Sequence, residues 1–96
     1  MAKVTEEQVE AVRERIASIP PGRVRTYGDI ADEVGLSSPR IVGWVMRTDA
    51  SDLPWYRVVP ASGRPAPHIA TRQLELLRAE GVLADGDRIP LRDYRV

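Results

Sequence analysis

The chain has 96 residues, no cysteine, and 14 basic against 14 acidic side chains. We expect residues 1–96 to form one domain, because a second hydrophobic core would not fit into this length. The lack of cysteine excludes disulfides and sulfur nucleophiles, and with His68 as the only histidine we expect neither a metal site nor a cofactor. The balanced charge excludes strong long-range attraction to nucleic acid, so any DNA binding must depend on local geometry.

Apolar spacing predicts three amphipathic helices in the first half of the chain. The first covers residues 6–19, follows the capping-box sequence Thr5-Glu6-Glu7-Gln8 and ends before two prolines. With their caps, the second and third cover residues 26–35 and 38–47. The short, glycine-containing connection between these two helices predicts a helix-turn-helix.

The second half predicts less regular structure. Residues 56–59 are strand-like and end at a proline, residues 64–68 form a proline-rich loop, and residues 69–80 form a last helix that Gly81 ends. The remaining tail, with a turn at Asp85-Gly86, either adds a strand or packs on the core. The fold class is therefore mainly α, a winged-helix-like domain with a short β element and a C-terminal helix. No apolar run is long enough for a membrane span and the N-terminus has no signal stretch, so we expect a cytoplasmic protein without membrane contact.

The outer face of the predicted third helix carries Arg40, Gly43, Trp44 and Arg47. In a helix-turn-helix this face is the one that meets a DNA groove. The alternative is that these residues form the solvated side of an ordinary bundle helix. A tryptophan on that face favours contact with a partner.

Five segments occur in one order and together resemble a single family. They are Pro20-Pro21-Gly22-Arg23-Val24, Thr26-Tyr27-Gly28-Asp29-Ile30-Ala31, Arg40-Ile41-Val42-Gly43, Leu53-Pro54-Trp55-Tyr56-Arg57-Val58-Val59 and Leu77-Arg78-Ala79-Glu80-Gly81. The chain resembles, over about residues 5–81, the DNA-binding domain of O6-alkylguanine-DNA alkyltransferases. Within that family it is most similar to the alkyltransferase-like proteins, in which Trp replaces the reactive cysteine of a Pro-Cys-His-Arg-Val motif.

The resemblance implies that the chain is not an enzyme. In the transferases a cysteine thiolate accepts the alkyl group and is activated through a histidine and a glutamate. Here Trp55 stands at the cysteine position and Tyr56 at the histidine position, whereas Glu80 matches the glutamate. An indole is not an alkyl acceptor at neutral pH, and we interpret Glu80 without its histidine as structural.

The resemblance also implies how DNA is read. The helix enters the minor groove, and the target nucleotide is flipped out of the stack. Arg40 would fill the resulting gap and Tyr27 would press on the phosphate of the target nucleotide. Gly43 suits the narrow groove floor, Trp44 is bulkier than the family's usual small residue, and Arg47 is a candidate phosphate contact.

The implied alkylguanine pocket has the backbone carbonyls of Trp55 and Val58 on its floor, where they would accept hydrogen bonds from the guanine amine. Met46 is either a pocket residue or a core residue. The loop over the pocket lacks the family's tyrosine-serine pair, so the partner of O6 stays open, and His68 is either a substitute or a plain loop residue. The predicted pocket residues are Tyr27, Met46, Trp55, Tyr56, Val58, Arg64 and Pro65.

The sequence leaves three functions to compare. The first is a non-enzymatic, monomeric and nucleoid-associated sensor that binds O6-alkylguanine in double-stranded DNA and flags it for nucleotide excision repair proteins, a partner implied by resemblance alone. The second is a small winged-helix transcription regulator. The third is an enzyme using Tyr56, Glu80 or His68, which no nucleophile-plus-base spacing supports. The preferred adduct, the downstream partner and the oligomeric state stay open.

Overall fold

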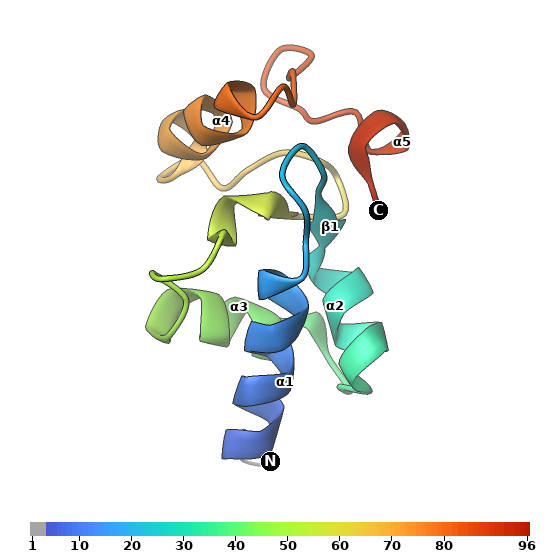
Figure 1. Ribbon diagram of the computed structural model, residues 1–96, viewed down its shortest axis with the longest axis vertical. Coiled ribbons are helices and arrows are strands. Elements are labelled where there is room, and N and C mark those ends of the chain that lie inside the picture. The colour runs from blue at the N-terminus through green and yellow to red at the C-terminus, as the bar shows by residue number, and fades with distance from the viewer. Residues whose placement is uncertain (1–3) are drawn as a thin grey trace.

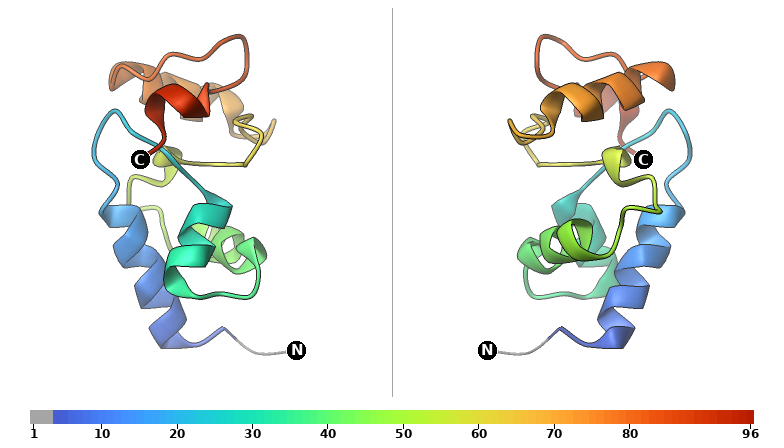
Figure 2. Two further views of the ribbon diagram at one scale, coloured as in Figure 1. Left: turned by 90° about the vertical axis from the view of Figure 1, so that its right-hand side faces the viewer. Right: turned by 90° about the vertical axis from the view of Figure 1, so that its left-hand side faces the viewer.

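About half of the chain is helical in the computed structural model, which describes residues 4–96. The elements in chain order are α1 (Glu6–Ala17), β1 (Arg25–Thr26), α2 (Tyr27–Val34), α3 (Pro39–Thr48), the 3-10 helix η1 (Trp55–Arg57), β2 (Val58–Val59), α4 (Ala70–Ala79) and α5 (Leu91–Tyr94). Helices α1 to α3 form one end of the molecule and α4 and α5 the other, as both views of Figure 2 show (Figures 1 and 2). The predicted fold class, mainly α with a helix-turn-helix, is confirmed.

Reciprocal side-chain caps begin the first two helices. In α1, Gln8 N donates to Thr5 Oγ1 at 3.1 Å while Thr5 N donates to Gln8 Oε1 at 3.0 Å. Thr26 and Asp29 make the same pair of bonds at the start of α2, both at 3.0 Å. Helix α1 ends at Ala17, two residues before the predicted end, because Ser18 Oγ donates to the carbonyl of Arg15 at 2.7 Å and closes the last turn.

The turn between α2 and α3 confirms the predicted helix-turn-helix. Gly35 has a φ of 78°, in the left-handed region that glycine adopts without strain, and ends α2. The Leu36 amide then donates to the Ala31 carbonyl at 2.8 Å. Ser38 Oγ accepts from the Arg40 amide at 3.1 Å, and Pro39 occupies the first position of α3.

Two hydrophobic cores meet at the small parallel sheet of β1 and β2. The first core lies among α1, α2 and α3 and includes Val58, whereas the second lies beneath α4 and the tail and includes Val59. Successive strand residues point to opposite faces, so β2 contributes one valine to each core. The predicted strand over 56–59 is wrong in its first half, because the Arg57 amide donates to the Pro54 carbonyl at 3.0 Å and winds 55–57 into η1.

The tail packs as a short helix and also extends the sheet. The Val24 amide donates to the Tyr94 carbonyl at 3.0 Å and the Val96 amide to the Val24 carbonyl at 3.1 Å. The predicted turn at Asp85-Gly86 is present, closed by a bridge between Asp85 and Arg88. Tyr94 packs against the second core, so both expected behaviours of the tail, pairing and packing, occur together.

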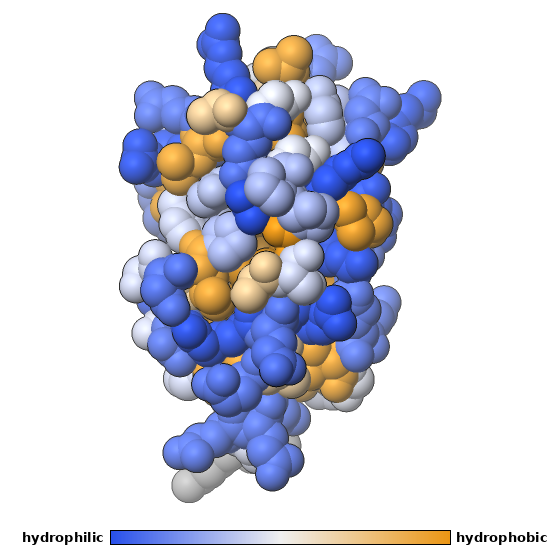
Figure 3. Space-filling model, viewed as in Figure 1, coloured by the Kyte–Doolittle hydropathy of each residue, from blue (hydrophilic) through white to orange (hydrophobic). Residues whose placement is uncertain are grey.

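Hydrophilic side chains cover the exposed side of α1, at the lower end of the view in Figure 3. This helix exposes Glu6, Glu7, Glu10 and Glu14. Among residues 4–96, no helix combines the length and the apolar character that crossing a membrane requires.

Gly63 holds the loop after β2 against the tail. It has a φ of +79°, and a Cβ placed on it would lie 2.4 Å from the Ile89 carbonyl oxygen. We expect Gly63→Ala to lower the free energy of unfolding by roughly 2 to 4 kcal/mol, since the backbone strain of a positive φ and the steric overlap of the new Cβ with Ile89 add to each other. The matched control is Gly86→Ala, which shares the positive φ but has open space around it, and should cost only about 1 kcal/mol. Equal losses for both variants in urea unfolding would contradict this role of the close contact.

Candidate nucleic-acid interface

A cavity of about 680 Å³ lies beside the helix-turn-helix. This volume is in the range of sites that enclose small ligands. Its wall comes from the start of α2, the second half of α3, the segment after α3, η1 and the segment that precedes α4. The lining residues are Tyr27, Gly43, Met46, Arg47, Thr48, Asp49, Ala50, Ser51, Trp55, Ala66, His68 and Ile69.

Tyr27 reaches this cavity from the first position of α2. Its ring also packs against the first core, so its position follows that of the α2 first turn. Burial raises the pKa of the Tyr27 hydroxyl, while the positive charge of Arg47 opposes that rise. The phenol is therefore a neutral hydrogen-bonding group near neutral pH, with a guanidinium nearby.

Trp55 provides an aromatic wall of the cavity. It begins η1, and its ring stands edge-to-face on the Tyr56 ring, with centroids 5.9 Å apart and planes at 86°. Such pairs are favourable beyond their buried area and restrict both rings. Met46 packs against the first core and also lines the cavity. It is therefore both a core residue and a cavity residue, the two positions between which the sequence left a choice.

The outer face of α3 presents a tryptophan and two arginines. Trp44 is 43% exposed, and Arg40 and Arg47 are exposed as well, whereas Gly43 is half-buried. Within residues 4–96, neither Arg40 nor Arg47 forms an ion pair. Both guanidinium groups therefore remain available for phosphates or bases without breaking an existing bridge.

Four predicted pocket residues lie outside the lining of this cavity. Tyr56 turns its hydroxyl to Glu80, Val58 is buried in the first core, Arg64 pairs with Asp87 at 3.6 Å, and Pro65 is buried. The contacts of Tyr56, Val58 and Arg64 join them to residues distant in sequence, which the sequence pattern does not reveal.

Residues 49–51 form a part of the cavity wall that no pattern in the sequence predicts. Arg13 of α1 holds this segment: its Nη1 donates to the Asp49 carbonyl at 2.6 Å, and Nη1 and Nη2 donate to Asp52 at 3.0 and 2.8 Å. Asp49 and Asp52 follow Arg13 by 36 and 39 residues in the sequence, so no local pattern predicts these contacts. His68, whose role was left open, lines the cavity.

A half-buried network surrounds the Glu80 carboxylate. It accepts from the Gly22 amide at 3.1 Å, the Tyr56 hydroxyl at 2.8 Å and Arg57 Nε at 3.0 Å. Arg57 also donates to the Ile19 carbonyl at 2.9 Å, so it links η1 to the segment that follows α1. Tyr56, at the position of the transferase histidine, donates its hydroxyl to the carboxylate, and these bonds are consistent with the structural role expected for Glu80.

The Arg57 hydrogen bonds, helped by those from Gly22 and Tyr56, lower the pKa of Glu80 to about 2. The carboxylate is thus ionised near neutral pH and is a poor proton acceptor. Conversely, burial and the bond to Glu80 raise the pKa of Tyr56, so that its hydroxyl stays neutral.

Gln73 is a buried polar residue that the sequence analysis did not single out. Its Nε2 donates to the Tyr56 carbonyl at 3.0 Å and to the Val58 carbonyl at 2.9 Å, which ties α4 to η1 and β2. The Val58 carbonyl, expected to face a guanine amine, therefore already accepts an internal hydrogen bond. Over residues 4–96, no cluster of His, Asp or Glu side chains is arranged to hold a metal ion.

These features define a helix-turn-helix domain with exposed arginines on α3 and a partly aromatic cavity beside it. Residues 7–82 match the family model described as the DNA binding domain of 6-O-methylguanine DNA methyltransferase. The chain belongs to this family.

Three similar proteins illustrate the family. A DNA base-flipping protein of Escherichia coli K12 is 43% identical over 83% of this chain and 67% of its own length. The structure of Schizosaccharomyces pombe Atl1 with DNA containing O6-carboxymethylguanine matches with a TM-score of 0.84 and 30% identity over 96% of both chains. The Mycobacterium tuberculosis O6-methylguanine methyltransferase matches with a TM-score of 0.68 and 32% identity over 88% of this chain, which spans 54% of the methyltransferase.

Proposed function

We propose that this protein binds O6-alkylguanine in double-stranded DNA and shelters the flipped nucleotide without altering it. The observation that carries the proposal is the cavity of about 680 Å³ beside α3, whose Arg40 and Arg47 form no ion pair within residues 4–96, in a chain that has no cysteine. A cavity next to a DNA-binding helix can take an extruded base, but a chain without a thiol has no acceptor of the family's kind. The similarity to the Escherichia coli DNA base-flipping protein and to Schizosaccharomyces pombe Atl1 with damaged DNA supports this proposal.

The proposed roles follow the geometry. Arg40, exposed at the start of α3, fills the stack from the minor groove after the nucleotide leaves it, and Arg47 contacts a phosphate. Tyr27 supports the flipped nucleotide at the cavity wall. Trp55 provides a flat apolar surface where the alkyl group displaces water.

A sensor that leaves the lesion intact requires other proteins to remove it. We extend the proposal to a monomer that marks the lesion for nucleotide excision repair proteins, by analogy with the bacterial relatives that the sequence resembles. Bending of the DNA around the intercalated arginine would provide the mark, because a kinked, unstacked step differs in shape from normal duplex.

The test is a titration of two short duplexes that differ only in one O6-methylguanine. Tryptophan fluorescence reports binding, and the Trp44→Phe variant restricts the change to Trp55. We expect tighter binding of the modified duplex, with the base recovered unchanged by mass spectrometry. Equal affinity for both duplexes, sequence-selective binding that ignores the lesion, or loss of the methyl group would each reject the proposal.

We expect that Trp55→Cys does not create an alkyltransferase. The new thiol would adjoin the neutral Tyr56 hydroxyl, and Glu80 with its pKa of about 2 would not accept a proton. The comparison variant, Trp55→Cys with Tyr56→His, provides an imidazole at this position and should react more readily. Intact mass after incubation with methylated duplex measures the transfer, and stoichiometric methylation of the single variant would contradict the argument.

A further inference from the structure

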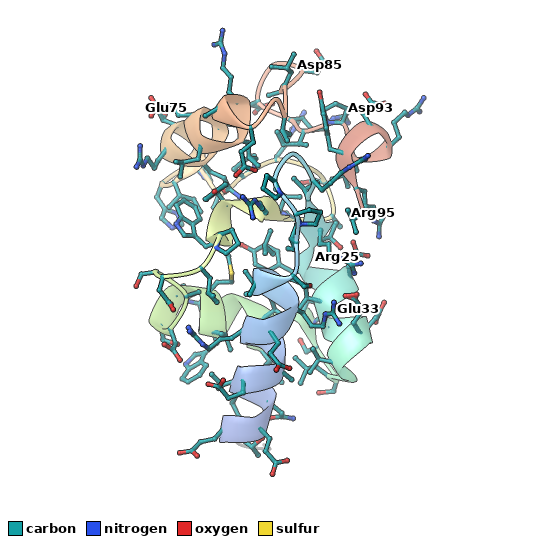
Figure 4. All side chains as sticks on the ribbon, in the orientation of Figure 1. Arg25, Glu33, Glu75, Asp85, Asp93 and Arg95 are labelled. Atoms are coloured by element: carbon teal, nitrogen blue, oxygen red, sulfur yellow. The ribbon has the colours of Figure 1, made fainter. Side chains whose placement is uncertain are left out.

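Two of the three acidic side chains of helix α2, Asp29 and Glu33, each bind an arginine from another part of the chain. Arg95 in the tail donates from Nε to Asp29 Oδ2 at 3.0 Å and from Nη2 to Oδ1 at 2.5 Å. Arg25 of β1 pairs with Glu33, and Arg15 of α1 lies 3.7 Å from the same carboxylate. In Figure 4, Arg95, Arg25 and Glu33 lie along the same side of the molecule, next to α2.

Asp29 has a second task besides pairing with Arg95. Its Oδ2 accepts from the Thr26 amide at 3.0 Å, which is half of the capping box that begins α2. The bond from Arg95 is the main cause that lowers the pKa of Asp29, and the Thr26 amide adds to it. Arg95 therefore orients the carboxylate that closes the first turn of α2, and Tyr27 is the first residue of that turn.

The backbone of the tail places Arg95 where it can reach Asp29. Tyr94 and Val96 bond to Val24 on both sides of Arg95 and hold this segment along the edge of β1. The Tyr94 hydroxyl accepts from the Leu83 amide at 3.2 Å, and the Tyr94 ring packs on the second core. The segment lies beyond residues 7–82, which match the family model.

We propose that Arg95 is a positioning residue of the lesion cavity, acting through Asp29 on the first turn of α2 and thereby on Tyr27. The tail then contributes to lesion binding without lining the cavity. This inference rests on the proposed function for its effect on affinity, but the link from Arg95 to the first turn of α2 exists in the free protein.

The first test compares Arg95→Ala with Arg92→Ala, which removes an exposed arginine of the same tail that has no ion pair within residues 4–96. We expect Arg95→Ala to weaken binding of the O6-methylguanine duplex about threefold to tenfold, a typical size for coupling through one side-chain contact. Arg92→Ala should change the affinity less than about twofold, and Arg95→Lys, which keeps the charge, should restore part of the loss. Equal losses for Arg95→Ala and Arg92→Ala would overturn the proposal.

A double-mutant cycle separates positioning from general destabilisation. In a Tyr27→Ala background, Arg95→Ala should lower lesion affinity by less than about 1.5-fold, because the side chain it positions is gone. All variants are compared at a temperature where thermal unfolding shows them folded. The same loss in both backgrounds would show that Arg95 acts on affinity by another route.

Amide hydrogen exchange of the free protein tests the link without DNA. We expect the Thr26 and Asp29 amides, both bonded within the capping box, to exchange at least about fivefold faster in Arg95→Ala and unchanged in Arg92→Ala. Unchanged exchange in Arg95→Ala would overturn the proposal. Faster exchange in a protein that shows no preference for the lesion would instead reject the proposed function and leave the link to α2 intact.

Discussion

Replacing Arg40 by alanine is expected to weaken binding of a duplex with one O6-methylguanine by roughly 1 to 3 kcal/mol, the cost of losing a side chain that stacks at an unstacked step. The fold should be unaffected, since the Arg40 side chain is exposed and forms no ion pair within residues 4–96. Its backbone amide donates to Ser38 Oγ at 3.1 Å, and alanine keeps that bond. Fluorescence titration measures the affinity, and thermal unfolding checks the fold.

Arg47→Ala is the matched control for Arg40→Ala. Both variants lose one exposed arginine of α3, so the general loss of positive charge is the same. A phosphate contact is made with damaged and undamaged DNA, and Arg47→Ala should therefore weaken both duplexes alike and flatten the salt dependence. Arg40→Ala should mainly affect the duplex with the lesion. If the Arg40→Ala variant kept the wild-type preference for the lesion, Arg40 would have no role in flipping the nucleotide.

The sequence predicts the first half of this fold well because local chemistry determines it. The caps at Thr5, Thr26 and Ser38 and the left-handed Gly35 each act within a few residues. The predicted strand over 56–59 fails at its start, because apolar and aromatic composition does not distinguish a strand from a single 3-10 turn. Only Val58 and Val59 find a partner strand, and that partner lies more than 30 residues earlier.

The candidate site was only partly predictable for a related reason. Residues on one helix face, such as Gly43 and Arg47, follow from periodicity, and both line the cavity. The wall at 49–51 depends on an arginine of α1, and the position of Tyr56 depends on Glu80, 24 residues away. Such contacts are set by tertiary packing, and neither the spacing of residue types nor the composition of the sequence predicts them.

The change Glu80→Ala is expected to lower the free energy of unfolding by roughly 2 to 4 kcal/mol, because it leaves a nearly buried charge without its partner. The Arg57 side chain is only 12% exposed and that of Glu80 14%. Without the carboxylate, Arg57 keeps the Ile19 carbonyl as an acceptor, while the Gly22 amide and the Tyr56 hydroxyl lose theirs. Urea unfolding measures the change.

Glu75→Ala is the matched control on the same helix. Its carboxylate is 64% exposed and lies 3.9 Å from Arg72, so its removal should cost less than about 0.5 kcal/mol. Tyr56→Phe isolates one bond of the network and should cost about 1 kcal/mol. If Glu80→Ala and Glu75→Ala were equally stable, the network around Glu80 would contribute nothing beyond an exposed ion pair.

The stabilisation by Glu80 should also depend on pH. The pKa of this carboxyl falls from an ordinary value of 4.5 to about 2 in the folded protein, mainly because Arg57 donates hydrogen bonds to it. A lowered pKa in the folded state means that the stabilisation is complete above about pH 4.5 and is lost as the pH falls toward 2, with an upper limit of about 3 kcal/mol. The double variant that combines Tyr56→Phe with Glu80→Gln has no carboxylate at this position. The difference in unfolding free energy between the wild type and this double variant should therefore shrink as the pH falls from about 4.5 toward 2. A difference that stays constant from pH 6 to pH 2.5 would show that the ionised carboxylate is not the stabilising form.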